Sequence, residues 1–218
     1  MQRIVMAALL AGALAGVVGF ALHMWQTTPL ILHAEIYEHG GTATNEAIAR
    51  MWQADGIERH AFSLLAQVVT AVGFAFMLVG AMALSGRQVS MQTGIVWGLC
   101  GYGALYMAPA LGMAPELPGM VAAELGERQA WWLGTALVSA GALTMIFFAK
   151  GAIFKVIAAL LLVLPHAYGA PHPVMEPGNV PAELAAQFAV ASMVVTALFW
   201  MALGAFGGYF YERFQPAE

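Results

Sequence analysis

Charged residues are scarce in this chain of 218 residues: Asp, Glu, Lys and Arg make up 9% of it, while 61% is hydrophobic. A soluble globular protein carries about 25% charged residues, so this composition argues against a soluble fold. Cysteine is scarcer still, because Cys100 stands alone in an apolar run. An internal disulfide and a cysteine-based metal cluster are therefore both excluded.

Motifs of familiar enzymes and nucleotide-binding proteins are missing as well. The sequence contains no P-loop, no GxSxG nucleophile motif and no HExxH zinc motif. Its histidines lie at the ends of the apolar segments and not deep within them, which argues against a haem held by paired histidines. We expect neither an enzyme, nor a permanent cofactor, nor a nucleic-acid partner.

Long apolar runs are what the sequence does have. A transmembrane helix needs about 20 apolar residues, and the runs predict an all-α integral membrane protein in contact with lipid. We expect one membrane domain over residues 1–218, built as a bundle of about six transmembrane helices. The expected spans cover residues 4–24, 61–84, 93–108, 130–149, 152–168 and 183–209.

Local signals refine this reading. The first apolar run is longer than the core of a signal peptide, so we expect a retained helix there. Pro109 is expected to end the third span, since proline interrupts a helix. Glycines recur at four-residue spacing in several runs, which favours close approach of two helices, within the chain or in an oligomer.

A short interfacial helix is predicted in the first external segment. Thr28 suits the N-cap position and Pro29 the first helical position. Glu35 and His39 are four residues apart and share one helix face, a spacing that can chelate a metal. The alternative is an amphipathic helix on the membrane surface whose polar residues only face water.

Histidine and carboxylate are concentrated on one side of the predicted membrane. Five Lys or Arg residues lie near one set of span ends and three near the other, which places both termini in the cytoplasm. All six histidines and ten of the twelve carboxylates then lie at the outer side. Imidazole and carboxylate together suit divalent transition metals, and an acidic rim concentrates cations. The candidate metal ligands are His33, Glu35, Glu38, His39, Glu116, Glu124, His166, His172 and Glu183.

Several of these candidates have competing explanations. The loop that carries Glu116 is rich in Pro and Gly, and it suits a plain helix connection as well as a binding site. Glu183 complements the dipole of the helix that it begins. His166 lies near the membrane boundary, where capping alone does not explain it, so it favours a functional role.

The polar residues considered within the spans are few, and none of them is charged. A proton-driven carrier usually keeps a carboxylate near the midplane, and the predicted spans have none there. Hydrogen bonds between helices, worth about 0.6 kcal/mol each, are the expected role. The polar residues considered are Gln67, Thr70, Ser139, Thr144, Gln187, Ser192 and Thr196.

Five sequence stretches resemble the CbtA family, the predicted cobalt transporter subunit. They are PLILHAEIYE (residues 29–38), PALGMAPELPG (109–119), AELGERQAWW (123–132), LPHAYGAP (164–171) and VPAELAAQFAVAS (180–192). The resemblance spans nearly the whole chain. It implies a bacterial inner-membrane protein that works with a small, single-span, histidine-rich partner such as CbtB. The motifs themselves carry Glu35, Glu38, Glu116, Glu124, His166 and Glu183.

The prediction from the sequence is a membrane subunit of a divalent metal uptake system, with Co²⁺ or Ni²⁺ as the transported ion. External His and carboxylate groups would gather the ion. The alternative is an accessory membrane subunit that transports nothing and holds a partner protein in place.

Overall fold

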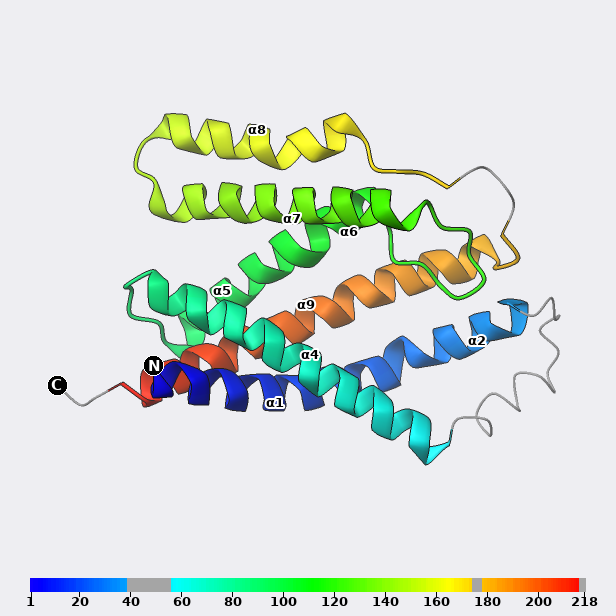
Figure 1. Cartoon of the computed structure of the whole chain (residues 1–218), viewed down its shortest axis with the longest axis horizontal. Coiled ribbons are helices and arrows are strands. Elements are labelled where there is room, and N and C mark those ends of the chain that lie inside the picture. The colour runs from blue at the N-terminus through cyan, green and yellow to red at the C-terminus, as the bar shows by residue number, and fades with distance from the viewer. Residues whose placement is uncertain (39–55, 174–177, 216–218) are drawn as a thin grey trace. The chain divides into compact units, whose positions relative to one another are not determined.

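The structure, a computed structural model, describes residues 1–38, 56–173 and 178–215, and every regular element in these ranges is a helix (Figure 1). Five helical segments are long and apolar enough to cross a membrane: Gln2–Gln26, Ile57–Leu84, Met91–Gly112, Leu125–Phe148 and Ala182–Arg213. A shorter apolar helix covers Ala152–Tyr168. The predicted all-α bundle of about six transmembrane helices is thereby confirmed.

The nine helical elements of the described residues follow in chain order. They are α1 (Gln2–Gln26), α2 (Thr28–Glu38), α4 (Ile57–Leu84), α5 (Met91–Tyr102), the π-helical turn η1 (Gly103–Met107), α6 (Ala108–Gly112), α7 (Leu125–Phe148), α8 (Ala152–Tyr168) and α9 (Ala182–Arg213). The short helix expected in the first external segment is α2. Its position at the membrane interface stays a prediction.

The helices group into two compact units. Among the described residues, unit 1 comprises 1–33, 56–99 and 194–215, and unit 2 comprises 34–38, 100–173 and 178–193. Both α5 and α9 contribute to each unit. Grouping by contacts is no test of separate folding, so the single membrane domain stays a prediction.

In unit 1, α1 packs antiparallel against α4. A Cβ atom added at Gly12 would overlap the backbone of Val72, and one at Gly16 would overlap Val68. The residue numbers of the contacts on α4 fall as those on α1 rise, so the two helices are antiparallel. The close approach that the glycine spacing predicts is therefore confirmed within the chain.

A second glycine contact in unit 1 joins α5 to α9. A Cβ at Gly94 would collide with the carbonyl oxygen of Gly204, and a Cβ at Gly98 would collide with that of Trp200. Because the obstacles are backbone atoms, no side-chain rotation can make room. Glycine at these positions lets the two helix backbones touch and gain dispersion contacts in lipid, where helix association has little hydrophobic drive.

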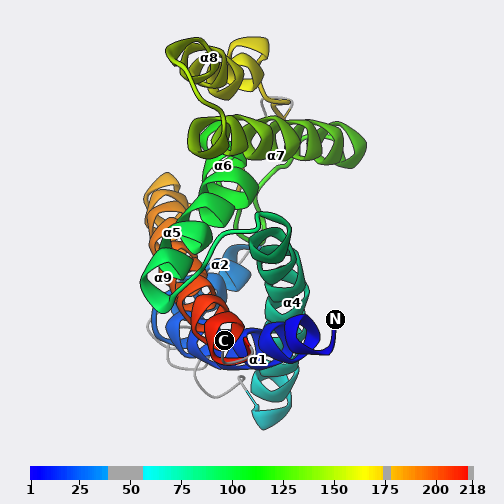
Figure 2. The same cartoon turned by 90° about the vertical axis from the view of Figure 1, so that its left-hand side faces the viewer.

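In unit 2, α7 and α8 form an antiparallel pair, and Figures 1 and 2 both show them side by side. The chain reverses between them at Gly151, whose φ of 108° lies in the region that favours glycine. The tight turn places the end of α7 beside the start of α8. Consequently, the start of α7 and the end of α8 lie together at the other end of the pair.

The expected end of the third span at Pro109 is wrong, because the helical run continues to Gly112. The chain first widens into the π-helical turn η1, in which the N–H of Ala108 donates to the carbonyl oxygen of Gly103. Pro109 then occupies the first turn of α6, where a missing N–H costs nothing. The changed hydrogen-bond register thus accommodates the proline without ending the helix.

Candidate metal-gathering site

In each unit, the described histidines lie at one end and most of the Lys and Arg residues lie at the other. In unit 1, α1 begins and α4 ends at the same end, and the parallel contact of α9 with α4 brings the end of α9 there. That end holds Arg3, Arg87 and Arg213, together with Glu212. The opposite end holds His23, His33, Glu58, Arg59 and His60.

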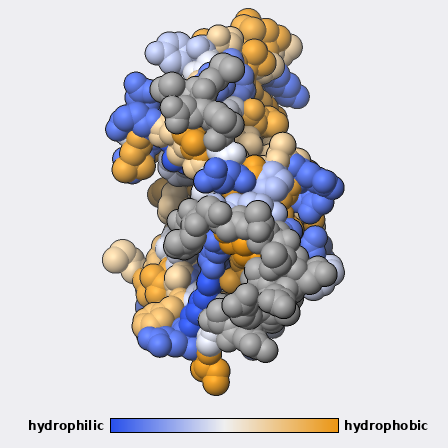
Figure 3. Space-filling view, turned by 90° about the vertical axis from the view of Figure 1, so that its right-hand side faces the viewer, coloured by the Kyte–Doolittle hydropathy of each residue, from blue (hydrophilic) through white to orange (hydrophobic). Residues whose placement is uncertain are grey.

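Unit 2 repeats the pattern. Lys150 and Lys155 lie at the α7–α8 turn. The opposite end of this unit carries the acids and histidines. The start of α9 lies at that end as well, because a Cβ at Gly178, shortly before α9, would lie 3.6 Å from the carbonyl oxygen of Gly119. Figure 3 faces the helix ends at the right of Figure 1 and shows several hydrophilic patches there. The groups at this end of unit 2 are Glu116, Glu124, Glu127, Arg128, His166, His172 and Glu183.

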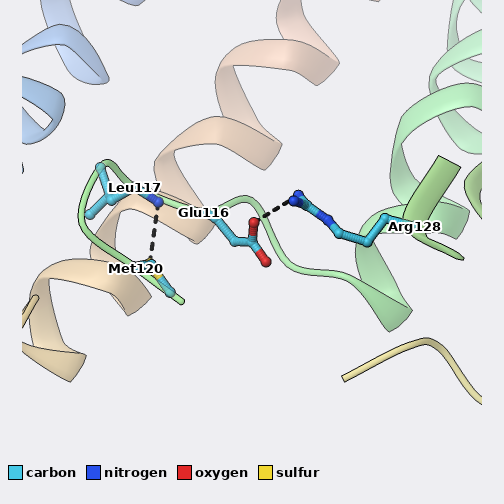
Figure 4. A network of polar contacts seen from close by, with 4 residues as sticks. All are labelled: Glu116, Leu117, Met120 and Arg128. Carbon is cyan, nitrogen blue, oxygen red and sulfur yellow. Dashed lines mark hydrogen bonds and ion pairs between the residues drawn. The ribbon is translucent and has the colours of Figure 1, made fainter. Parts of the chain in front are cut away.

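Glu116 forms an ion pair in the loop of residues 113–124. Its Oε2 lies 2.7 Å from Nη2 of Arg128, in the first turns of α7 (Figure 4). The two side chains are 26% and 33% exposed, respectively, so water still screens the pair. The same loop is closed by the N–H of Leu117, which donates to Sδ of Met120 at 3.2 Å. Arg128 therefore holds the carboxylate at a defined place above α7.

Glu124 caps the start of α7. Its Oε2 accepts a hydrogen bond of 2.9 Å from the backbone N–H of Glu127. Hydrogen bonds from the N–H groups of Gly126 and Glu127 hold the pKa of the Glu124 carboxyl below its usual value. This cap explains why α7 begins at Leu125, five residues before the expected start of the span. It also gives Glu124 a structural role that competes with metal binding.

His166 lies in the last turn of α8 beside an aromatic side chain of α7. The ring centroids of His166 and Trp131 are 5.9 Å apart at an interplanar angle of 67°, an edge-to-face arrangement. Trp131 in turn fills the space next to Gly112, where a Cβ would overlap the indole. His172 and Glu183 are both exposed. Glu183 lies in the first turn of α9, as the helix-dipole explanation requires.

The first external segment is described only in part. His33 and Glu35 are half-buried on α2, and the grouping assigns them to different units. Glu38 is the last residue of that helix. His39 lies outside the described residues, and with it the predicted pairing of Glu35 and His39.

The described residues contain no group of three or more His, Cys, Asp or Glu side chains able to hold a metal ion. The nine ligand candidates therefore stay predictions. The structure adds two features that the sequence interpretation missed. One is the pairing of Glu116 with Arg128, which had been counted only as an outer cation. The other is Thr135, buried on α7 and absent from the polar residues considered within the spans.

Multiple apolar helices of spanning length define a multi-pass membrane protein. The family model of the probable cobalt transporter subunit, CbtA, matches residues 1–212. The chain therefore belongs to the CbtA family, and the resemblance is confirmed. No curated protein and no solved structure matches the chain. The family is one of transporter subunits and not of enzymes, its description implies cobalt as the ion, and a subunit implies a partner component.

Proposed function

We propose that the chain is the membrane subunit of a cobalt uptake system and that it gathers Co²⁺ at the end of the helices that carries its histidines and acids. One observation carries this proposal: in each unit separately, the described histidines lie at the end opposite the main cations. Fixed negative charge raises the concentration of a divalent cation before any specific contact forms. Imidazole and carboxylate then supply the ligand types that first-row transition metals prefer.

Glu116 and His166 are the residues on which the proposal depends most. Both belong to unit 2 and lie near the start of α7, where Arg128 contacts the first and Trp131 the second. Glu124 and Glu183 add negative charge at the same end, and His172 an imidazole. Ni²⁺ binds such ligands at least as well as Co²⁺, so nickel is the expected competitor.

The partner in this proposal is a small single-span subunit with a histidine-rich segment, as in the CbtB-like partner of the family resemblance. The protein would lie in the bacterial inner membrane with both termini in the cytoplasm. The glycine faces of α1, α5 and α9 are filled by contacts within unit 1. They therefore offer no support for an oligomer, nor for an accessory role that would use them to hold a partner.

The test is uptake of radioactive cobalt by cells that express the chain together with its partner subunit. We expect the double variant His166→Ala, Glu116→Ala to lose accumulation while its abundance in the membrane stays the same. Glu212→Ala is the matched control, because Glu212 is an exposed carboxylate at the opposite end of α9. Unchanged uptake by the double variant would exclude this site. Weaker partner binding with unchanged metal content would favour the accessory role.

A further inference from the structure

Helix α7 buries a line of polar atoms in the interior of unit 2. Trp131, Thr135 and Ser139 follow one another at four-residue spacing and therefore share one face of the helix. Their exposed fractions are 9%, 1% and 0%. Within the part of the chain that the structure describes, Nε1 of Trp131, Oγ1 of Thr135 and Oγ of Ser139 have no hydrogen-bond partner. An unpaired buried polar group is costly, so three in one line require an explanation.

The usual way to satisfy a hydroxyl in a membrane helix is present on the same helix. Oγ1 of Thr144 donates to the carbonyl oxygen of Ala140 at 2.8 Å, one turn back. Thr135 and Ser139 have the same kind of acceptor one turn back and do not bond to it. Small size alone does not explain them either, because alanine packs as closely and Ala142 on this helix is also fully buried.

The segment that faces this line has an altered backbone. Helix α7 packs against η1 and α6. A Cβ at Gly112 would meet Trp131, and one at Gly103 would lie 3.7 Å from Leu143. Thr135 and Ser139 therefore lie level with the helical run between Gly103 and Gly112. This run contains the π-helical turn and Pro109, so its hydrogen-bond register departs from that of a regular α-helix.

The indole of Trp131 closes the line at the end that carries Glu116 and His166. It lies beside Gly112 of α6, where any Cβ would overlap it, and against the His166 ring of α8. Unsatisfied hydroxyls beside altered backbone are the kind of surroundings in which water and hydrated ions bind inside membrane proteins. Here the indole separates them from solvent.

We propose that Trp131, Thr135 and Ser139 form a closed hydrated path for a divalent cation into the interior of unit 2, ending near Ser139, with the Trp131 indole as its plug. The cation keeps part of its water shell, and the two hydroxyls bind that water. When the indole moves away from Gly112, water enters from the His166 end. The identity of the cation as Co²⁺ rests on the proposed function; the path and its plug do not.

Thiol labelling tests the path without any metal. In a Cys100→Ala chain, Thr135→Cys and Ser139→Cys are treated with a charged, membrane-impermeant methanethiosulfonate reagent from the side of His166. The minor state of a two-state protein is populated at roughly 0.1–10%, so removing the plug with Trp131→Ala should raise the labelling rate about tenfold or more. Ala142→Cys, equally buried beyond the polar line, and Leu137→Cys, on the exposed apolar face, should stay unlabelled.

Gly112→Ala provides a second way to displace the indole if Trp131→Ala fails to fold. The path would be overturned by one result with the plug removed by either substitution. That result is labelling of Thr135→Cys and Ser139→Cys no faster than labelling of Ala142→Cys. Protection of the labelled thiols by added Co²⁺ or Ni²⁺ is expected. Labelling that neither ion slows would overturn the assignment of a divalent cation to the path. Protected labelling in cells that accumulate no cobalt would instead count against the proposed function alone.

Isosteric substitutions separate the hydroxyls from the shape of the helix. The double variant Thr135→Val, Ser139→Ala keeps nearly the same volume and removes both hydroxyl groups. We expect it to abolish protection of the Trp131→Cys thiol by Co²⁺ at unchanged abundance, whereas the matched control Thr144→Val keeps it. Full protection in the double variant would show that the hydroxyls only fill space.

Discussion

The ion pair between Glu116 and Arg128 allows a direct test of whether Glu116 meets the metal. The pair is 2.7 Å long and both side chains are partly exposed, so it contributes about 0–1 kcal/mol. A metal that binds Glu116 has to compete with Arg128 for the carboxylate. Removing the arginine with Arg128→Gln should therefore strengthen cobalt binding by up to about fivefold, the equivalent of about 1 kcal/mol. Loss of a nearby positive charge acts in the same direction.

The opposite substitution should have the opposite effect. Glu116→Gln removes the carboxylate and leaves Arg128 to repel the cation, so the half-saturating cobalt concentration should rise. If Glu116 only stabilises the loop, the two substitutions break the same ion pair and should behave alike. Opposite shifts therefore show that the Glu116 carboxylate acts on the cation, by contact or by its charge, and equal shifts identify a structural role.

The assay is the initial rate of radioactive cobalt uptake against cobalt concentration, normalised to the amount of protein in the membrane. Low ionic strength preserves the electrostatic contribution. Lys150→Gln changes the net charge by the same amount at the opposite end of α7 and serves as the control. Half-saturating concentrations that move in one direction for Glu116→Gln and Arg128→Gln, or do not move, would refute the reasoning.

Three further predictions concern stability. Gly98→Ala should destabilise the protein by about 1–3 kcal/mol, because the new methyl group meets a backbone carbonyl of α9. Gly134→Ala is the control and should be tolerated, because a Cβ there meets nothing within 4 Å. Thermal unfolding in detergent measures both variants. Glu124→Ala should destabilise α7 at neutral pH but not in acid. The pKa of the Glu124 carboxyl is lower in the folded state than in the unfolded state. Its stabilisation is therefore complete above the unfolded pKa and disappears as the pH falls through the folded pKa. A difference in melting temperature between the two proteins that stays constant with pH would contradict this. Tyr102→Phe removes the 3.0 Å hydrogen bond to the carbonyl oxygen of Met193 and should destabilise the protein by about 0.6 kcal/mol. The same melting assay should show a small drop in melting temperature. A variant that does not fold would contradict this estimate.

Local sequence signals were sufficient to predict most of the helices. Apolar runs of spanning length place five helices and the shorter α8, because a helix in lipid satisfies its own backbone without help from neighbours. Thr28 and Pro29 predict the start of α2 for the same local reason. Alternation of short connections then puts successive helix ends on opposite sides. The separation of Lys150 from His166 in unit 2 follows from that alternation alone.

The details of the candidate site depended on packing between segments far apart in the sequence. Nothing near Glu116 indicates that Arg128 pairs with it, and nothing near His166 indicates the indole of Trp131. The π-helical turn that carries the chain through Pro109 also depends on its neighbours, since the proline alone predicts an end. Spacing assigns side chains to one face of a helix but not the rotation of that helix against the next. Only the tertiary structure therefore decided that Thr135 and Ser139 are buried without partners within the described residues. Composition and periodicity had already determined a membrane protein of several apolar helices, because a helix in lipid needs a long apolar run.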